Sequence, residues 1–143
     1  MTFLKITAKD AEFIASAKDF GFTDCWTENM VIESLEKGRL SGEIAVSGDK
    51  KAGYITYSFA QDVADIDVVF VFPEYRRRGL ATALLSRFLS AAKDGGIKKV
   101  FLEVRKSNLP AINLYSASGF SKISERKKYY GDGEDALVFS KEI

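Results

Sequence analysis

The chain has 143 residues, of which 46% are hydrophobic and 13% aromatic. This length suits a single domain spanning residues 1–143, and the composition excludes a disordered polypeptide. The 21 basic and 20 acidic residues give a formal net charge of +1, so no global field favours nucleic acid or an anionic membrane. We therefore expect no nucleic-acid partner and no membrane partner, and any anion site must be local.

The histidine and cysteine content narrows the chemistry further. The sequence has no histidine, which removes Ser-His and Cys-His nucleophilic sites and His-ligated metal sites, so we expect no metal. A general base must then be a carboxylate, a lysine, a tyrosine or a water held by one of them. Cys25 is the one cysteine; we interpret it as a structural thiol beside Trp26, the alternative being an acyl-carrying nucleophile.

Targeting signals are not evident. The N-terminus lacks the long apolar run of a signal peptide, and the most apolar helical stretch, residues 80–92, is shorter than a bilayer span and carries Arg87. These features predict a cytoplasmic protein.

The first half of the chain mixes both periodicities, alternating residues for strands and three- to four-residue spacing for helices. The predicted elements are a strand at 2–7, helices at 8–20 and 24–37, and a hairpin of strands at 43–47 and 52–60.

The second half has a β-α-β-α-β order. Residues 66–72 form a run of Val, Ile and Phe broken only by Asp67, which is typical of a strand buried on both faces, and Pro73 ends it. The remaining predicted elements are helices at 79–94 and 108–118 and strands at 97–105, 120–128 and 135–142. This order predicts an α/β or α+β sheet with helices on both faces.

A basic segment, Arg76-Arg77-Arg78-Gly79-Leu80-Ala81, lies between the strand ending at Phe72 and the next helix. A helix N-terminus leaves backbone N–H groups unpaired and carries the positive end of the helix dipole. Gly79 lets the backbone approach a ligand, and Ala81 is small for the same reason. These features predict a local anion site suited to a pyrophosphate; the alternative is a solvated basic run before an ordinary helix.

The strand at 97–105 carries a carboxylate in its middle. Val100, Leu102 and Val104 share one face, and Phe101 and Glu103 share the other. A carboxylate in a buried strand needs a partner or a role, and desolvation would raise its pKa toward the range that suits a general base. The alternative is a Glu103 at a wet sheet edge, or one paired with Arg105 or Lys99.

The basic segment also matches a family signature. Arg76-x-x-Gly79-x-Ala81 resembles the acyl-CoA-binding motif of the GNAT acetyltransferases, usually written Arg/Gln-x-x-Gly-x-Gly/Ala. In that family the loop amides bind the CoA pyrophosphate, and the preceding strand lies beside the pantetheine and acetyl group. The resemblance implies acetyl-CoA as co-substrate, bound by Val69, Phe70, Val71, Arg76, Arg77, Arg78, Gly79, Leu80, Ala81, Thr82 and Asn108.

Two further stretches resemble the same family over roughly residues 66–140. The first is Leu102-Glu103-Val104-Arg105-Lys106-Ser107-Asn108, followed by Ala111-Ile112-Asn113-Leu114-Tyr115-x-x-x-Gly119-Phe120. The second is Glu125-Arg126-Lys127-Lys128-Tyr129-Tyr130, followed by Glu134-Asp135-Ala136. Together with the basic segment at residues 76–81, these stretches are similar to the bacterial ribosomal-protein-alanine N-acetyltransferases of the RimI type. In the first half only Cys25-Trp26-Thr27-Glu28 is reminiscent of the family.

The resemblance implies a fold and a reaction. The fold is a mixed, mostly antiparallel central sheet, splayed at its middle, with CoA between the strands at 66–72 and 97–105. Glu103 takes a proton from the incoming ammonium through a water, and Tyr115 donates one to the departing CoA thiolate. By spacing alone Tyr115 is a core aromatic, and Asn108 is a helix cap.

The acceptor implied by the resemblance is a protein N-terminal amine, with direct transfer in a ternary complex. The alternatives are a small-molecule amine, a lysine side chain, or a non-catalytic CoA-binding module. Tyr129 and Tyr130 either line the acceptor slot or form a hydrophobic hairpin end.

Overall fold

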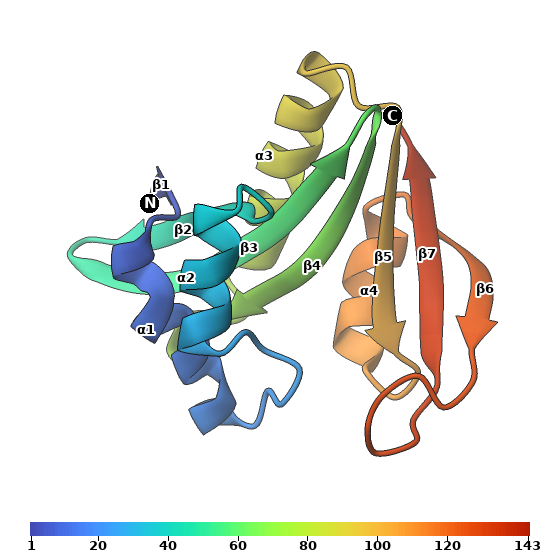
Figure 1. The fold of residues 1–143 in the computed structure, drawn as a ribbon, viewed down its shortest axis with the longest axis horizontal. Coiled ribbons are helices and arrows are strands. Elements are labelled where there is room, and N and C mark those ends of the chain that lie inside the picture. Colours follow the sequence, from blue (N-terminus) through green and yellow to red (C-terminus); the bar gives the residue numbers. More distant parts are fainter. The chain divides into compact units, whose positions relative to one another are not determined.

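The computed structural model describes all 143 residues, which form one seven-stranded sheet with helices (Figure 1). The hydrogen-bonded order of its strands is β1 (Thr2–Lys5), β2 (Ser41–Ser47), β3 (Lys50–Ala60), β4 (Val63–Val71), β5 (Lys99–Arg105), β7 (Ala136–Glu142) and β6 (Ser121–Arg126). β4 and β5 are parallel, whereas β1–β2, β2–β3, β5–β7 and β6–β7 are antiparallel. The predicted mixed, mostly antiparallel sheet is confirmed.

Four α-helices accompany the sheet. They are α1 (Ala11–Ala15), α2 (Glu28–Glu36), α3 (Leu80–Asp94) and α4 (Leu109–Ala117), with 3-10 turns at Ala8–Asp10, Ser16–Phe20 and Pro73–Tyr75. None of these helices combines the length and the apolarity needed to cross a bilayer. The chain divides into two compact units, Met1–Ser58 with Val68–Leu85, and Phe59–Asp67 with Ser86–Ile143.

In the first unit, the predicted helix at 8–20 is broken into three short segments. Thr7 and Asp10 form a capping box, in which Thr7 N donates to Asp10 Oδ2 at 2.8 Å, and this starts a 3-10 turn in place of a regular helix. Gly21 ends the last segment in a left-handed conformation, with φ +85°.

The second helix was predicted to begin at Asp24, but it begins at Glu28. The reason is Thr27, whose side-chain oxygen accepts a hydrogen bond from Met30 N at 3.2 Å and caps the helix. The residues before Thr27 therefore form an irregular connection, and from it the Trp26 Nε1 donates to the Thr56 hydroxyl of β3 at 3.0 Å.

The centre of the first unit is Tyr54 on β3, which is fully buried. Its hydroxyl donates to the carbonyl oxygen of Ile14 at 3.2 Å, so the phenol is satisfied inside the core and ties α1 to the sheet. Burial raises the pKa of Tyr54 above its ordinary value, which keeps the hydroxyl protonated as a donor.

In the second unit, β7 lies between β5 and β6 (Figure 1). On β5 the predicted alternation is confirmed: Val100, Leu102 and Val104 are buried, while Phe101 and Glu103 are only partly exposed.

The strand β4 differs from its prediction. It begins at Val63 instead of Ile66, and its first part is not buried on both faces, because Asp65 and Asp67 are exposed. These two carboxylates alternate with the buried Ala64 and Ile66, so the apolar run that suggested a doubly buried strand starts only at Val68.

Candidate active site

Glu103 lies at the centre of the candidate acid–base site in the second unit. Its side chain is 30% exposed, and Arg126 at the end of β6 approaches it, with Nε 3.6 Å from Oε1. The other carboxylate oxygen, Oε2, is buried and has no hydrogen-bond partner. A buried carboxylate oxygen without a partner is costly, so it marks a place where a further donor belongs. The sequence indicated Arg105 or Lys99 as possible partners of Glu103, and Arg126 was not among them.

Tyr129, from the turn between β6 and β7, lies beside this carboxylate, and Tyr130 lies against Tyr129. The pKa of Tyr129 is raised, chiefly by a hydrogen bond to Glu103, and the Arg126 guanidinium lies 5.6 Å from the Tyr129 ring centre. Tyr130 meets Tyr129 edge to face, with ring centroids 5.1 Å apart. Tyr129 is 50% exposed, so its ring is open to solvent.

Tyr115, on α4, is only 7% exposed and packs edge to face on Phe120 at 5.9 Å. Burial raises the pKa of its phenol, and the neighbouring Tyr130 raises it further. The phenol therefore stays protonated at neutral pH, which allows it to donate a proton and prevents it from acting as a base. Tyr130 thus lies near the Tyr115 phenol and against Tyr129, and Tyr129 in turn forms a hydrogen bond with Glu103.

Two carboxylates of β4, for which no role was predicted from the sequence, extend this site. Asp65 pairs with Phe101 across the parallel β4–β5 ladder, so Asp65 and Asp67 lie on the same face as Phe101 and Glu103. Asp65 and Asp67 keep contact with solvent, but the surrounding protein partly desolvates both carboxyl groups. This desolvation, followed by the Glu103 charge, raises the pKa of Asp65. Desolvation, followed by the Asp65 charge, raises the pKa of Asp67 to about 6.

The sequence held a signal for these two residues. Asp67 interrupted an otherwise apolar strand, and Asp65 lies two residues before it on the same face. Two carboxylates at this spacing, in a strand beside Glu103, indicate an acidic surface that the three residues share. This pair was missed because the strand was predicted to be buried on both faces.

The predicted anion site at residues 76–81, here called the phosphate cradle, lies in the first unit. It follows a 3-10 turn that connects β4 to α3. The first intrahelical bond of α3 is donated by Ala83 N to Gly79 O at 3.0 Å, so the amides of Leu80, Ala81 and Thr82 precede it and lack an intrahelical acceptor. Gly79 has φ +74°, and a Cβ built on it would meet no atom within 4 Å. The loop therefore has open space above it, and its donor set fits an anionic phosphate.

The three arginines of this loop have different surroundings. Arg76 folds back onto β4: its Nε donates to Val71 O at 2.8 Å, and its guanidinium lies 5.4 Å from the Phe70 ring centre. The Arg76 amide donates to Pro73 O at 3.3 Å, so this residue supports the loop. Arg78 lies 5.8 Å from the Tyr75 ring centre, and Arg77 is exposed with a left-handed φ of +63°.

Asn108 and Val69–Val71 lie on the elements predicted for them, whereas Cys25 precedes α2 and does not lie within the predicted helix. Asn108 caps α4, because its side-chain oxygen accepts from Ala111 N at 3.3 Å. Val69 is partly exposed near the end of β4, while Phe70 and Val71 are buried there. Cys25 is partly exposed, and its Sγ lies 3.9 Å from Ala15 O.

Known proteins with similar sequences share one chemistry. The sequence matches the Acetyltransferase (GNAT) family over residues 10–120. An N-alpha-acetyltransferase of Saccharolobus solfataricus is 43% identical over 125 residues, covering 78% of this chain and 75% of that protein. A ribosomal protein bS18-alanine N-acetyltransferase of Escherichia coli is 32% identical over 118 residues, covering 80% of this chain and 79% of that protein.

Solved structures agree with this assignment. The crystal structure of the Escherichia coli ribosomal-protein-alanine N-acetyltransferase has a TM-score of 0.89 at 28% identity, covering 99% of this chain and 93% of that chain. The structure of Arabidopsis thaliana NAA60 in complex with acetyl-CoA has a TM-score of 0.85 at 20% identity, covering 99% of this chain and 98% of that chain. At this identity the similarity concerns the fold alone. With a family match over most of its length and a relative at 43% identity, the chain belongs to the GNAT family of acetyltransferases.

Proposed function

We propose that this protein acetylates the α-amine of a protein N-terminus, with acetyl-CoA as donor and an alanine-starting ribosomal protein as the substrate class. The names of two relatives, an N-alpha-acetyltransferase and a ribosomal protein bS18-alanine N-acetyltransferase, support this acceptor. The observation that carries the chemistry is the Glu103 carboxylate, with one oxygen buried and unpartnered beside Tyr129. The cytoplasm is the compartment that suits such substrates.

Glu103 acts as the general base in this proposal. An ammonium is not nucleophilic, so the acceptor must lose a proton before it attacks the thioester. A water held by the accessible part of the Glu103 carboxylate, whose side chain is 30% exposed, would relay the proton from the amine to the carboxylate. Arg126, 3.6 Å from Oε1, orients the carboxylate from the other side.

Tyr115 acts as the general acid. Its phenol is kept protonated by burial, and the same desolvation would raise the basicity of a CoA thiolate that forms beside it. A proton from Tyr115 would therefore stabilise the leaving group as the bond to the thioester carbon breaks.

The cradle holds the donor in this proposal. The amides of Leu80, Ala81 and Thr82 would donate to the pyrophosphate, and Gly79 leaves the space that it needs. Backbone amides at Val69–Val71 would polarise the thioester carbonyl, and Asn108 would contact CoA. Acetyl then passes directly to the amine in a ternary complex, where proximity supplies much of the rate.

The test compares initial rates of thiol release with three acceptor classes. The first is an alanine-starting peptide with a free N-terminus, the second is the same peptide N-terminally blocked but with a free lysine, and the third is a small primary amine. The proposal predicts turnover on the free N-terminus alone. Turnover on the blocked peptide or the small amine would move the acceptor to a lysine or a small molecule, and acetyl-CoA binding without turnover would indicate a binding module.

A further inference from the structure

One guanidinium bonds two carboxylates of the turn between β6 and β7 (residues 127–135, the β6–β7 turn). Arg105 is the last residue of β5, and its side chain is only 18% exposed. Its Nη1 donates to Asp132 Oδ2 at 2.8 Å and to Glu134 Oε1 at 2.9 Å. A partly buried guanidinium that bonds two carboxylates forms strong charge-assisted hydrogen bonds.

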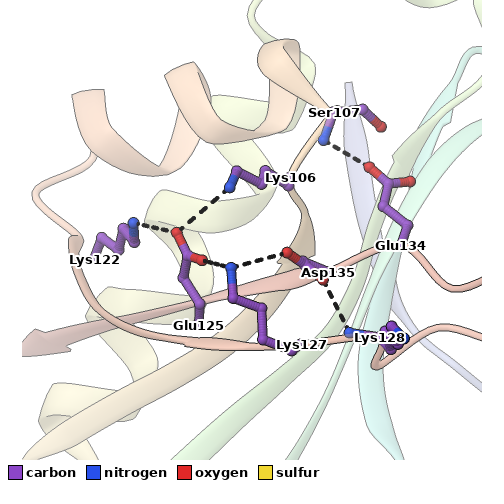
Figure 2. A network of polar contacts seen from close by, with 8 residues as sticks. All are labelled: Lys106, Ser107, Lys122, Glu125, Lys127, Lys128, Glu134 and Asp135. Carbon is purple, nitrogen blue, oxygen red and sulfur yellow. Dashed lines mark hydrogen bonds and ion pairs between the residues drawn. The ribbon is translucent and has the colours of Figure 1, made fainter.

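The backbone just after Arg105 completes this attachment. Ser107 N donates to Glu134 Oε2 at 2.8 Å, as Figure 2 shows, and Lys106 N donates to Asp135 O at 3.1 Å. Glu134 therefore accepts a hydrogen bond at each carboxylate oxygen. These bonds lower the pKa of Glu134, the Ser107 contact first and the Arg105 contact second, so its ionised form is favoured.

Arg105 also contacts the tyrosine pair of the turn. Its guanidinium lies 4.1 Å from the Tyr130 ring centre, which is cation–π distance. Tyr130 meets Tyr129 edge to face, and Tyr129 forms a hydrogen bond with Glu103. Arg105 and Glu103 are two residues apart on the same face of β5, so one strand carries both the proposed base and the group that holds the turn above it.

We propose that Arg105 is a positioning residue, which holds the β6–β7 turn through Asp132 and Glu134 and thereby fixes Tyr129 and Tyr130 as the wall that receives the acceptor amine. This inference rests on the proposed N-terminal acetyltransferase function and extends it to acceptor binding. An ordered wall binds an incoming peptide without the entropy cost of ordering it first, so Arg105 acts on acceptor affinity and not on the donor.

A second set of ion pairs in the same hairpin supplies a matched control. Glu125 on β6 contacts Lys122 at 2.7 Å and Lys127 at 3.0 Å, and Lys127 reaches Asp135 at 3.2 Å (Figure 2). The Lys122 side chain is 48% exposed, and exposed ion pairs contribute little. Lys122→Gln therefore removes a hairpin ion pair without touching the attachment made by Arg105.

The experiment compares the wild type with Arg105→Gln, Arg105→Lys and Lys122→Gln. We expect Arg105→Gln to raise the KM for an alanine-starting peptide about tenfold, with kcat within about threefold and the Kd for acetyl-CoA within about twofold. Arg105→Lys keeps the charge but loses the planar fork, so it should recover part of the KM. Lys122→Gln should behave as the wild type.

A second readout needs no substrate. Hydrogen–deuterium exchange of residues 127–135 should be faster in Arg105→Gln than in the wild type and in Lys122→Gln. An unchanged peptide KM in a folded Arg105→Gln that binds acetyl-CoA would overturn the proposal. Equal losses in kcat and in donor binding would also overturn it, because they would show a general structural role.

The exchange measurement separates this inference from the proposed function. If the wild type acetylates no peptide N-terminus, the proposed function fails, and the role of Arg105 in acceptor binding fails with it. If the wild type is active but the exchange of residues 127–135 does not depend on Arg105, only the positioning role is wrong.

Discussion

Glu103 combines two properties that a general base needs, a route to solvent and an unused acceptor. Its side chain is partly exposed, yet Oε2 is buried without a hydrogen-bond partner. A purely structural carboxylate in this position would gain by bonding both oxygens, as Glu134 does with Ser107 and Arg105. The protein itself therefore leaves part of the acceptor capacity of Glu103 unused, and the exposed part of its side chain gives the proton a route to solvent.

Glu103→Gln tests the proposed base. The amide has nearly the same shape but cannot accept a proton, so kcat should fall by about 10²-fold or more at pH 7.5, while the Kd for acetyl-CoA stays within about twofold. Stopped-flow thiol release and calorimetry provide the two numbers. A variant that keeps the wild-type kcat would remove Glu103 from the chemistry.

Tyr115→Phe tests the proposed acid. The substitution keeps the ring and its edge-to-face contact with Phe120 while removing the proton donor, so kcat should fall about 10- to 100-fold with little change in thermal stability. Steady-state kinetics beside a melting curve measure both. Loss of stability with unchanged kcat would make Tyr115 a core residue only.

Asp67 carries a stability cost that depends on pH. Its pKa is raised from 3.8 to about 6, chiefly by burial, so folding favours the protonated form. This cost is absent below pH 3.8, and it grows as the pH rises from 3.8 through about 6, so the folded state loses stability over that range. Asp67→Asn should therefore stabilise the protein at pH 7 by about 1 kcal/mol, a value reduced for the solvent exposure of this side chain, and by nothing near pH 3.5.

Urea unfolding of Asp67→Asn at the two pH values measures this difference. Asp62→Asn, an exposed aspartate just before β4, is the control and should change neither value. Equal effects of Asp67→Asn at both pH values would contradict the assignment.

At the scale of elements, β5 and the turns around it organise the candidate site. The regular elements were predictable from periodicity: α3 follows its apolar spacing to Asp94, and β5 shows the predicted alternation. The start of α2 was not, because one side-chain cap at Thr27 decides it. The Arg126–Glu103 contact could not be predicted from the sequence either, because only the strand order, with β7 between β5 and β6, brings the end of β6 beside Glu103.

The cradle at the start of α3 is tested by two substitutions of Gly79. Its φ of +74° strains any other residue, so both Gly79→Ala and Gly79→Glu should lose about 1 kcal/mol of stability. Only Gly79→Glu adds a negative charge where the pyrophosphate is proposed to bind, and its acetyl-CoA affinity should fall more than about tenfold below that of Gly79→Ala. Equal affinities by calorimetry would place the donor elsewhere.

The hairpin of β6 and β7 should respond to acid. The bonds from Lys122 and Lys127 lower the pKa of Glu125 from 4.5 to about 2, so the stabilisation from this group is present above pH 4.5 and is lost as pH falls through about 2. An NMR titration of the side-chain carboxyl carbons should give Glu125 a midpoint near 2. A midpoint near 4.5 would show that these ion pairs do not persist in solution.

At the scale of the whole molecule, the family assignment is supported by most of the chain. The proposed binding of the acceptor involves fewer residues, those of the β6–β7 turn. The family match spans residues 10–120 and therefore ends before the β6–β7 turn. The turn carries Tyr129 and Tyr130, which we propose to receive the acceptor. Sequence motifs therefore indicate the acetyltransferase chemistry more directly than they indicate which amine is acetylated.

The most direct test uses one peptide that carries both candidate amines, an N-terminal alanine with a free α-amine and an internal lysine. The protein is incubated with acetyl-CoA and this peptide, and tandem mass spectrometry locates the acetyl group. We expect acetylation of the α-amine that depends on the protein and is absent with Glu103→Gln at matched times. Acetylation confined to the lysine, or no acetylation by a protein that binds acetyl-CoA, would contradict it.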